Sequence, residues 1–243
     1  MISLFSYLIL VLVGILPSVI WLAYWLRKDC HPEPKALIAK TLLLGIILSP
    51  LAIIAQLVSL EWFSSMLGVP ASTLGNSSWF YLWAAFVEEL IKYGAVFFVV
   101  LRNPEFDEPV DAMIYMLTAA LGFAAMENIL VANHMAGEGA EMTLRILGLR
   151  FTGATLLHAL SSALLGYFIA LGWFAMRARV TLFISGLMVA TVFHWVFNLF
   201  VAKMDQSLSI KFSTALLIVM AFLISILFDK IKERDSVTQA TSC

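Results

Sequence analysis

The sequence predicts an all-α fold: a polytopic transmembrane helix bundle of about seven transmembrane helices, with the N-terminus outside and the C-terminus inside. Two observations predict this class. Of the 243 residues, 62% are hydrophobic and only 13% are charged, whereas soluble domains carry about 25% charged residues. The chain also divides into seven apolar runs long enough to cross a bilayer. The runs are 4–26, 36–60, 79–101, 112–132, 151–176, 180–202 and 212–228.

Each run has its own character. No basic segment precedes the first run and no small-residue cleavage site follows it, so we expect a retained helix and not a signal peptide. Pro50 is expected to kink the second run, and a loop is expected over 61–78. The third run carries three charged residues. The fourth is rich in Ala and Gly, which let helices approach closely and favour an interior position.

The remaining segments complete the count. The segment 137–149 is too short and mixed to span, and we expect an interfacial or re-entrant piece there. The fifth and sixth runs each contain one histidine, and the seventh contains no ionisable group. One domain, 1–243, is sufficient for this length, with residues 230–243 as a cytoplasmic tail. The count of seven carries an uncertainty of one helix either way.

The distribution of Lys and Arg predicts the orientation. Loops on the predicted inner side and the tail hold ten of these cations and the outer segments hold four, which favours N-out, C-in by the positive-inside rule. The ten are Arg27, Lys28, Lys35, Lys40, Arg102, Arg177, Arg179, Lys230, Lys232 and Arg234. The four are Arg145, Arg150, Lys203 and Lys211.

The charged group in the third run indicates a functional site. Glu88, Glu89 and Lys92 lie within five residues near the middle of the run, where each charge costs roughly 2.5–3.5 kcal/mol on insertion scales. Glu88 and Lys92 share a helix face and could neutralise each other. Glu89 points about 100° away from Glu88 around the helix, so it needs a further partner.

Other deep polar residues are predicted to meet this group. Glu127, His158 and His194 occupy three further runs, and Asn198 follows His194 by one helical turn. At about 1.5 Å per residue, Glu88, Glu89 and these three ionisable groups lie roughly 8–15 Å from the outer ends of their runs. We therefore expect one polar cavity that opens outward. Taken singly, Asn128 is an interhelical hydrogen-bond partner, and Ser161 and Ser162 are expected to bond backbone carbonyls or to aid packing.

This set of side chains suits hydrolysis of an amide. An ionised glutamate in an apolar setting can act as general base, and His194 with Asn198 can direct two donors at a developing oxyanion. The other routes to intramembrane cleavage lack their marks. The sequence contains no His-Glu-x-x-His helix and no Gly-x-Gly-Asp, and Phe183 precedes Ser185-Gly186 where a rhomboid-type motif needs glycine.

Four motifs in order resemble the PrsW family, within the superfamily of type II CAAX prenyl endopeptidases and other glutamate-type intramembrane proteases. They are Glu88-Glu89-x-x-Lys92, Phe123-x-x-x-Glu127-Asn128, His158 and His194-x-x-x-Asn198. The stretch Asp107-Glu108-Pro109-Val110-Asp111 is similar to this family's approach to its second motif. The motif-bearing core runs from about 79 to 200. In the prenyl endopeptidase branch, histidine stands at the position of Glu127.

The resemblance implies an intramembrane endopeptidase in a bacterial inner membrane. Its substrate would be a single-span membrane protein, such as an anti-sigma factor cut on its extracytoplasmic side in the first step of regulated proteolysis. The resemblance implies Glu88 as the water-activating base, tuned by Glu89 and Lys92, and His158 as the group that assists proton transfer. His194 and Asn198 would bind the oxyanion. Glu127 belongs to the catalytic set, Asn128 has a tuning or structural role, and Arg150 is a candidate substrate-binding residue.

We expect no metal or other cofactor. Glu127, His158 and His194 could supply three zinc ligands, but Lys92 would place positive charge beside the cation, and the histidines lack the i, i+4 spacing that prearranges two ligands. A net charge of −1 and the lack of a basic patch predict no nucleic-acid partner; membrane lipid surrounds the bundle. Two other functions stay open: a proton-coupled transporter or channel, and a non-catalytic membrane scaffold.

Overall fold

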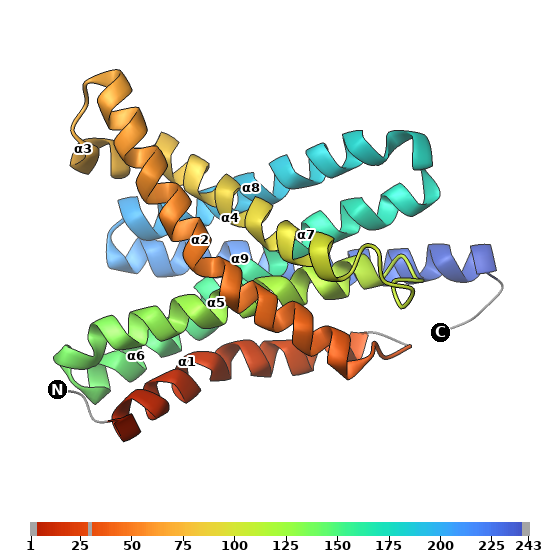
Figure 1. Ribbon diagram of the computed structural model, residues 1–243, viewed down its shortest axis with the longest axis horizontal. Coiled ribbons are helices and arrows are strands. Elements are labelled where there is room, and N and C mark those ends of the chain that lie inside the picture. The colour runs from red at the N-terminus through yellow and green to blue at the C-terminus, as the bar shows by residue number, and fades with distance from the viewer. Residues whose placement is uncertain (1–3, 29–30, 240–243) are drawn as a thin grey trace.

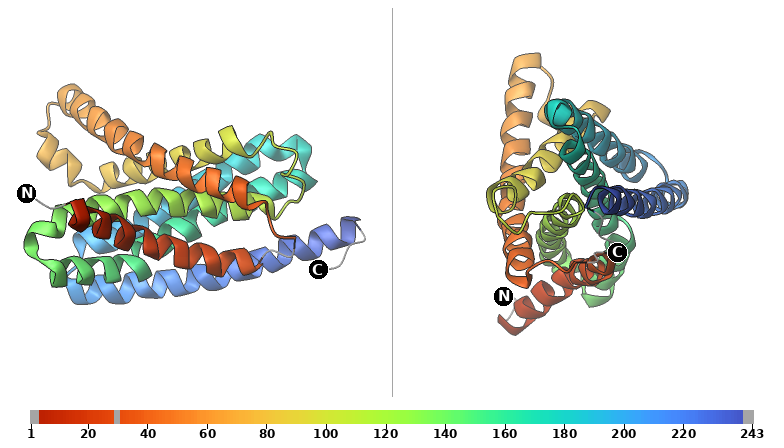
Figure 2. Two further views of the ribbon diagram at one scale, coloured as in Figure 1. Left: turned by 60° about the horizontal axis from the view of Figure 1, so that its bottom comes forward. Right: turned by 90° about the vertical axis from the view of Figure 1, so that its right-hand side faces the viewer.

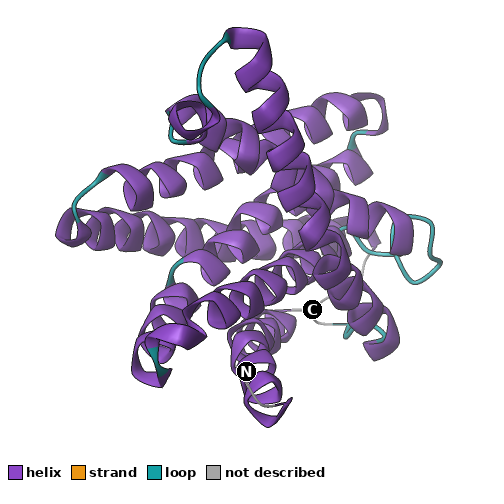
Figure 3. Ribbon diagram, turned by 60° about the vertical axis from the view of Figure 1, so that its left-hand side comes forward, coloured by secondary structure: helices purple, strands orange, loops and turns teal. Residues whose placement is uncertain are grey.

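The computed structural model describes residues 4–28 and 31–239, with side chains for 7–28 and 31–235. Cys30 and Cys243 lie outside the described residues. The described chain is helical throughout and contains no strand (Figures 1 and 3). Its long helices are α1 (Leu4–Trp25), α2 (Lys35–Leu67), α4 (Ser78–Val99), α5 (Asp111–Met135), α7 (Ala154–Phe174), α8 (Arg179–Lys203) and α9 (Gln206–Gln239). Two short helices, α3 (Ala71–Gly75) and α6 (Ala140–Thr152), stand between them.

The polytopic helix bundle predicted from the sequence is confirmed. Six helical segments of the described chain are long and apolar enough to cross a membrane. They are 7–28, 35–67, 111–138, 140–174, 176–203 and 206–235. Helix α4 is also long, but every stretch of 18 residues within it contains Glu88, Glu89 and Lys92. The seven predicted runs therefore correspond to seven long helices, of which α4 carries the charged site.

Two boundaries differ from the prediction. The expected loop over 61–78 is wrong in its first part, because α2 continues to Leu67 and ends only at Gly68, whose φ of 64° is a left-handed helix cap. Helix α3 occupies part of the remainder, directly after Pro70. The predicted tail 230–243 is helical as far as Gln239, since α9 continues without a break. The short piece expected over 137–149 is α6, a helix of 13 residues.

Helix α5 forms the centre of the bundle (Figure 2). All of its residues from 111 to 125 are buried, and it packs against α1, α2 and α7. Two glycines set the closest of these approaches. A Cβ at Gly45 of α2 would lie 2.2 Å from the Ala119 carbonyl oxygen, and a Cβ at Gly122 of α5 would lie 2.1 Å from that of Leu42. The two backbones are therefore in contact, as small residues at a helix crossing permit.

The long helices run alternately in opposite directions along the bundle (Figure 1). The start of α1 and the connections α2–α4, α5–α7 and α8–α9 lie at one end. The connections α1–α2, α4–α5 and α7–α8, with the last turns of α9, lie at the other. Helix α4 packs against α2 and α8, and α7 packs against α5 and α8. This arrangement brings the polar residues of α4, α5, α7 and α8 toward one region.

Candidate active site

The predicted convergence of deep polar residues is confirmed by the structure. Helix α4 contributes Glu88, Glu89 and Lys92, α5 contributes Glu127 and Asn128, and α7 and α8 contribute His158 and His194. Six of these seven side chains are buried, and Glu127 is half-buried at the edge. Burying charged groups is tolerated only when they are paired and hydrogen-bonded, so the contacts within the cluster decide what each residue does.

Glu89 is the anchor of the cluster. Its side chain is fully buried and accepts four hydrogen bonds. Oε1 accepts from Lys92 Nζ at 2.7 Å and from Ser161 Oγ at 2.9 Å and lies 2.9 Å from His194 Nδ1, while Oε2 accepts from Ser162 Oγ at 2.7 Å. Every acceptor site of Glu89 that faces the cluster is thus in use.

The two serines differ from the sequence prediction. Ser161 and Ser162 were expected to bond backbone carbonyls or to aid packing, yet both hydroxyls donate to the Glu89 carboxylate. Only Ser161 also lies near a backbone acceptor, the His158 carbonyl oxygen at 3.3 Å. The physical reason is that a buried carboxylate is a stronger acceptor than a carbonyl oxygen already used by a helix.

Lys92 pairs with Glu89 and not with Glu88. The i, i+4 pair with Glu88 that the spacing favours is replaced by the i, i+3 pair with Glu89. The same ammonium lies 2.8 Å from His158 Nδ1, and it sits 5.0 Å from the centre of the Phe123 ring. Lys92 therefore joins α4 to α7, and Phe123, the first residue of the second motif, packs against both Lys92 and His158.

His158 is held on both sides of its ring. Nδ1 contacts Lys92, and Nε2 lies 3.0 Å from Glu127 Oε2. Glu127 in turn accepts from Arg150 at 2.9 Å, so it orients His158 and bridges to the edge of the cluster. Arg150 Nε also donates to Asn128 Oδ1 at 2.6 Å, and the proposed role of Arg150 in substrate binding stays a prediction. Asn128 donates to Thr155 Oγ1 at 3.0 Å, which confirms it as an interhelical hydrogen-bond partner.

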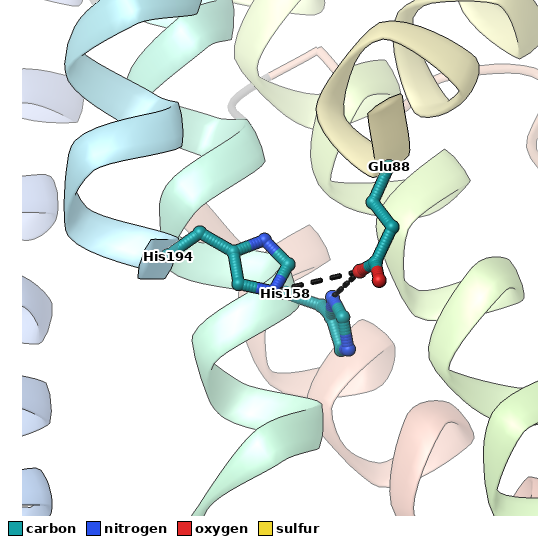
Figure 4. Close-up of side chains that lie close together, drawn as sticks. All are labelled: Glu88, His158 and His194. Carbon is teal, nitrogen blue, oxygen red and sulfur yellow. Dashed lines mark ion pairs between the residues drawn. The ribbon is translucent and has the colours of Figure 1, made fainter. Parts of the chain in front are cut away.

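Glu88 faces the two histidines (Figure 4). Its Oε2 atom lies 3.4 Å from His194 Nε2 and 3.9 Å from His158 Nδ1. This oxygen is buried and has no hydrogen-bond partner within the described structure. A buried polar atom without a partner is uncommon in native proteins and needs a functional explanation.

Gln56 is a site residue that the sequence analysis missed. From α2, its Nε2 atom donates to Glu88 Oε1 at 3.0 Å and fixes the carboxylate so that Oε2 faces the histidines. The available signal was that Gln56 is the only amide side chain in the apolar run 36–60. A cavity of about 320 Å³ touches Gln56, Glu88 and Asn198 together with Phe80 and Tyr81. Glu88 is thus the acidic side chain of the cluster that borders an open space.

The donor set at Glu88 also fits a divalent metal in kind. Glu88, His158 and His194 can each offer one atom within 4.8 Å of the others, and two imidazoles with one carboxylate is a known catalytic zinc set. In both histidines the other ring nitrogen contacts a carboxylate, Glu127 or Glu89, which is the usual outer support of a metal ligand. The set differs from the one weighed in the sequence: Glu88 takes the third place, because Glu127 turns to the far side of His158.

A helix bundle with a buried glutamate–histidine cluster beside a cavity belongs to the membrane-embedded hydrolases. Over residues 33–227 the chain matches the family described as PrsW family intramembrane metalloprotease. The chain belongs to this family. It is a multi-pass membrane protein and an intramembrane protease.

The relatives cover most of the chain. The protease PrsW of Geobacillus kaustophilus is 31% identical over 172 residues, which is 70% of this chain and 69% of the relative. The protease PrsW of Bacillus subtilis is 29% identical over 189 residues, 74% of this chain and 77% of the relative. No solved structure matches this chain significantly.

Proposed function

We propose that this protease hydrolyses a peptide bond of a single-span membrane protein near the outer face of a bacterial inner membrane, with Glu88 as the water-activating base. The observation that carries this proposal is the Oε2 atom of Glu88. It is buried, lacks a hydrogen-bond partner, faces His194 and belongs to a side chain that lines the cavity. A water bound there would complete its hydrogen bonding, and its proton would pass to the carboxylate.

The neighbouring groups suit the later steps. His194 contacts Glu89 through Nδ1 and leaves Nε2 beside Glu88, where it can exchange a proton with Glu88 and pass it to the leaving amine. The sequence analysis gave proton transfer to His158, but both ring nitrogens of His158 already contact Lys92 and Glu127. Asn198 lines the same cavity and supplies an amide donor for the oxyanion.

The catalytic type follows from the position of Lys92. A divalent ion held by Glu88, His158 and His194 would polarise the scissile carbonyl and would ease the deprotonation of water. The ammonium of Lys92, however, lies 2.8 Å from His158 Nδ1, the nitrogen that such an ion would use. Both cations cannot share that lone pair. We therefore assign the reaction to a glutamate-type mechanism without a metal.

The membrane side of the reaction follows from the polar depth and the charge distribution. The cavity beside Glu88 includes Gly75 of α3 and Ala202 near the end of α8, so it opens toward the bundle end that holds the α2–α4 and α8–α9 connections. That end holds fewer Lys and Arg residues than the other, as outer loops do. An anti-sigma factor with one transmembrane span is the substrate class that fits cleavage on this side.

The first experiment is replacement of the base. Purified Glu88→Gln protein should lose about 10²–10⁴-fold in cleavage of a single-span substrate, because glutamine cannot accept the proton. Glu61→Gln is the matched control, since Glu61 is exposed on α2. Both variants should keep the wild-type thermal unfolding midpoint. A folded Glu88→Gln protein with more than about a tenth of wild-type activity would rule out Glu88 as the base.

A second experiment tests the metal. Active protein should contain much less than one equivalent of zinc by elemental analysis, and its activity should survive dialysis against a strong chelator. The Lys92→Met variant is the informative companion, because it removes the cation that contacts His158 Nδ1. A stoichiometric metal in the wild type, whose removal stops turnover and whose return restores it, would overturn the glutamate-type assignment and leave the protease assignment intact.

A further inference from the structure

A second cavity, of about 480 Å³, lies between α4, α7 and α8 at the bundle end that holds the α4–α5 and α7–α8 connections. Arg179 is the first residue of α8 and Trp173 stands next to the last residue of α7, so the mouth lies at the helix ends. Tyr93 lies six residues before the end of α4, which places the inner wall roughly 9 Å along the helix. The cavity therefore spans the depth of a lipid headgroup and the first part of an acyl chain.

The walls are built from aromatic pairs. The rings of Tyr93 and Phe183 lie 4.4 Å apart, and those of Phe106 and Trp173 lie 5.2 Å apart with an interplanar angle of 69°. Paired rings of this kind hold each other in place, so the walls are formed before any ligand enters. Aromatic side chains at the depth of a membrane interface are also typical neighbours of lipid.

One cation stands at the mouth. Arg179 Nε donates to the Gly172 carbonyl oxygen at 2.9 Å, which fixes the guanidinium across the end of α7. A Cβ at Gly172 would lie 3.1 Å from Arg179 Cγ, so the glycine leaves the space that the arginine stem occupies. The guanidinium retains N–H donors in a fork that matches a phosphate group. Among the described residues, no acidic side chain lines this cavity.

The geometry points to a binding site for an anionic phospholipid, with its phosphate on Arg179 and an acyl chain against the aromatic walls. A soluble phosphate would leave the aromatic walls unused. A zwitterionic headgroup carries its own cation and gains less from an arginine. Basic pockets between transmembrane helices on the cytoplasmic side are suited to anionic headgroups, and this end of the bundle is the one at which Lys and Arg concentrate. The site is separate from the Glu88 cavity, and the inference does not rest on the proposed cleavage.

The test measures lipid retention by native mass spectrometry after purification of the full chain from mixed vesicles of phosphatidylglycerol and phosphatidylcholine. The wild type should retain phosphatidylglycerol over phosphatidylcholine by about tenfold or more, the worth of one charge-assisted hydrogen-bonded pair. Arg179→Gln should reduce this preference to within about twofold. Arg177→Gln is the matched control, because Arg177 is exposed two residues away and does not line the cavity, and it should keep the preference.

Further arms decide between sources and guard against misfolding. Inorganic phosphate at millimolar concentration should not displace the retained lipid; displacement would show a simple anion site and overturn the lipid assignment. Gly172→Ala, which crowds the Arg179 stem, should weaken the preference in the same direction and decides the matter if Arg179→Gln does not fold. Equal retention of both lipids by the wild type, or a preference lost in Arg177→Gln and kept in Arg179→Gln, would overturn the inference.

Discussion

At the scale of single residues, the two adjacent glutamates have different environments and therefore different roles. Glu89 accepts from Lys92 and two serine hydroxyls and contacts His194, so its charge is neutralised and its lone pairs are in use. Glu88 has one donor, Gln56, and one free oxygen beside a cavity. A group with free acceptor capacity can take up a proton, whereas a saturated one can only hold its neighbours in place.

This difference predicts the outcome of a double-mutant cycle on Lys92. Lys92→Met should destabilise the protein by on the order of 3–5 kcal/mol, because it leaves Glu89 buried without its cation. The double variant Glu89→Gln/Lys92→Met should recover much of that loss, since the pair is then removed as a whole. Unfolding in mixed detergent micelles measures the coupling between the two sites.

The matched control for this cycle is Glu88→Gln combined with Lys92→Met. We expect little coupling there, because the ammonium is bonded to Glu89 and His158 and not to Glu88. A coupling to Glu88 as large as that to Glu89 would mean that Lys92 neutralises the base, as the i, i+4 spacing alone favours. The pairing seen in the structure would then be incorrect.

The site residues could largely be predicted from the sequence, but their partners could not. An ionisable residue at bilayer depth is costly in any membrane protein, so Glu88, His158 and His194 are visible as exceptions in apolar runs. Which glutamate Lys92 chooses depends on the rotation of α4 against α7, and sequence spacing does not contain that angle. Gln56 was missed for the same reason, since one amide in an apolar helix gives no indication of the residue it faces.

At the scale of helices, the contact between α2 and α5 decides whether Gln56 reaches Glu88. Composition indicated close packing of the fourth run through its small residues, and the structure confirms an interior α5. Apolarity gave the number of helices for the same reason, since a bilayer demands long apolar segments. The end of α2 was less predictable, because residues 61–67 contain no glycine or proline and the helix continues to the Gly68 cap.

We predict that Gly45→Ala and Gly122→Ala each destabilise the protein by about 1–3 kcal/mol or more, the cost of overpacking a contact that cannot relax. In both, the added methyl would meet a backbone carbonyl oxygen at 2.2 Å or less. Gly94→Ala is the control within the bundle, since a Cβ there meets nothing within 4 Å. Thermal unfolding in detergent compares the three.

Activity should follow the same order, because separation of α2 from α5 withdraws Gln56 from Glu88. We expect the two crossing variants to lose turnover at a temperature where they remain folded, and Gly94→Ala to keep it. Crossing variants as stable and as active as Gly94→Ala would show that the helices separate without consequence, and would remove α2 from the account of the site.

At the scale of the whole molecule, the alternating helices divide the cations between two ends. The structure places the α1–α2, α4–α5 and α7–α8 connections at the same end as the last turns of α9. The sequence groups ten of the fifteen Lys and Arg residues with that end and four with the other. The two ends are therefore unequal in charge, and the Glu88 cavity opens toward the one with fewer cations.

This asymmetry predicts that the Glu88 cavity faces outward. In a background in which Cys30 and Cys243 are replaced by serine, single cysteines at Ser72 on α3 or at Gly139 between α5 and α6 should react with a membrane-impermeant maleimide added to intact cells. A cysteine at Ala178 in the α7–α8 connection is the matched control at the other end and should react only after permeabilisation. A reporter fused after residue 243 should read cytoplasmic. The positive-inside rule counts Lys and Arg in short loops, which these are, so the expected contrast is all-or-none. Labelling of the Ser72 and Gly139 positions only after permeabilisation would invert the bundle, move cleavage to the cytoplasmic side and remove an extracytoplasmic anti-sigma segment as the substrate.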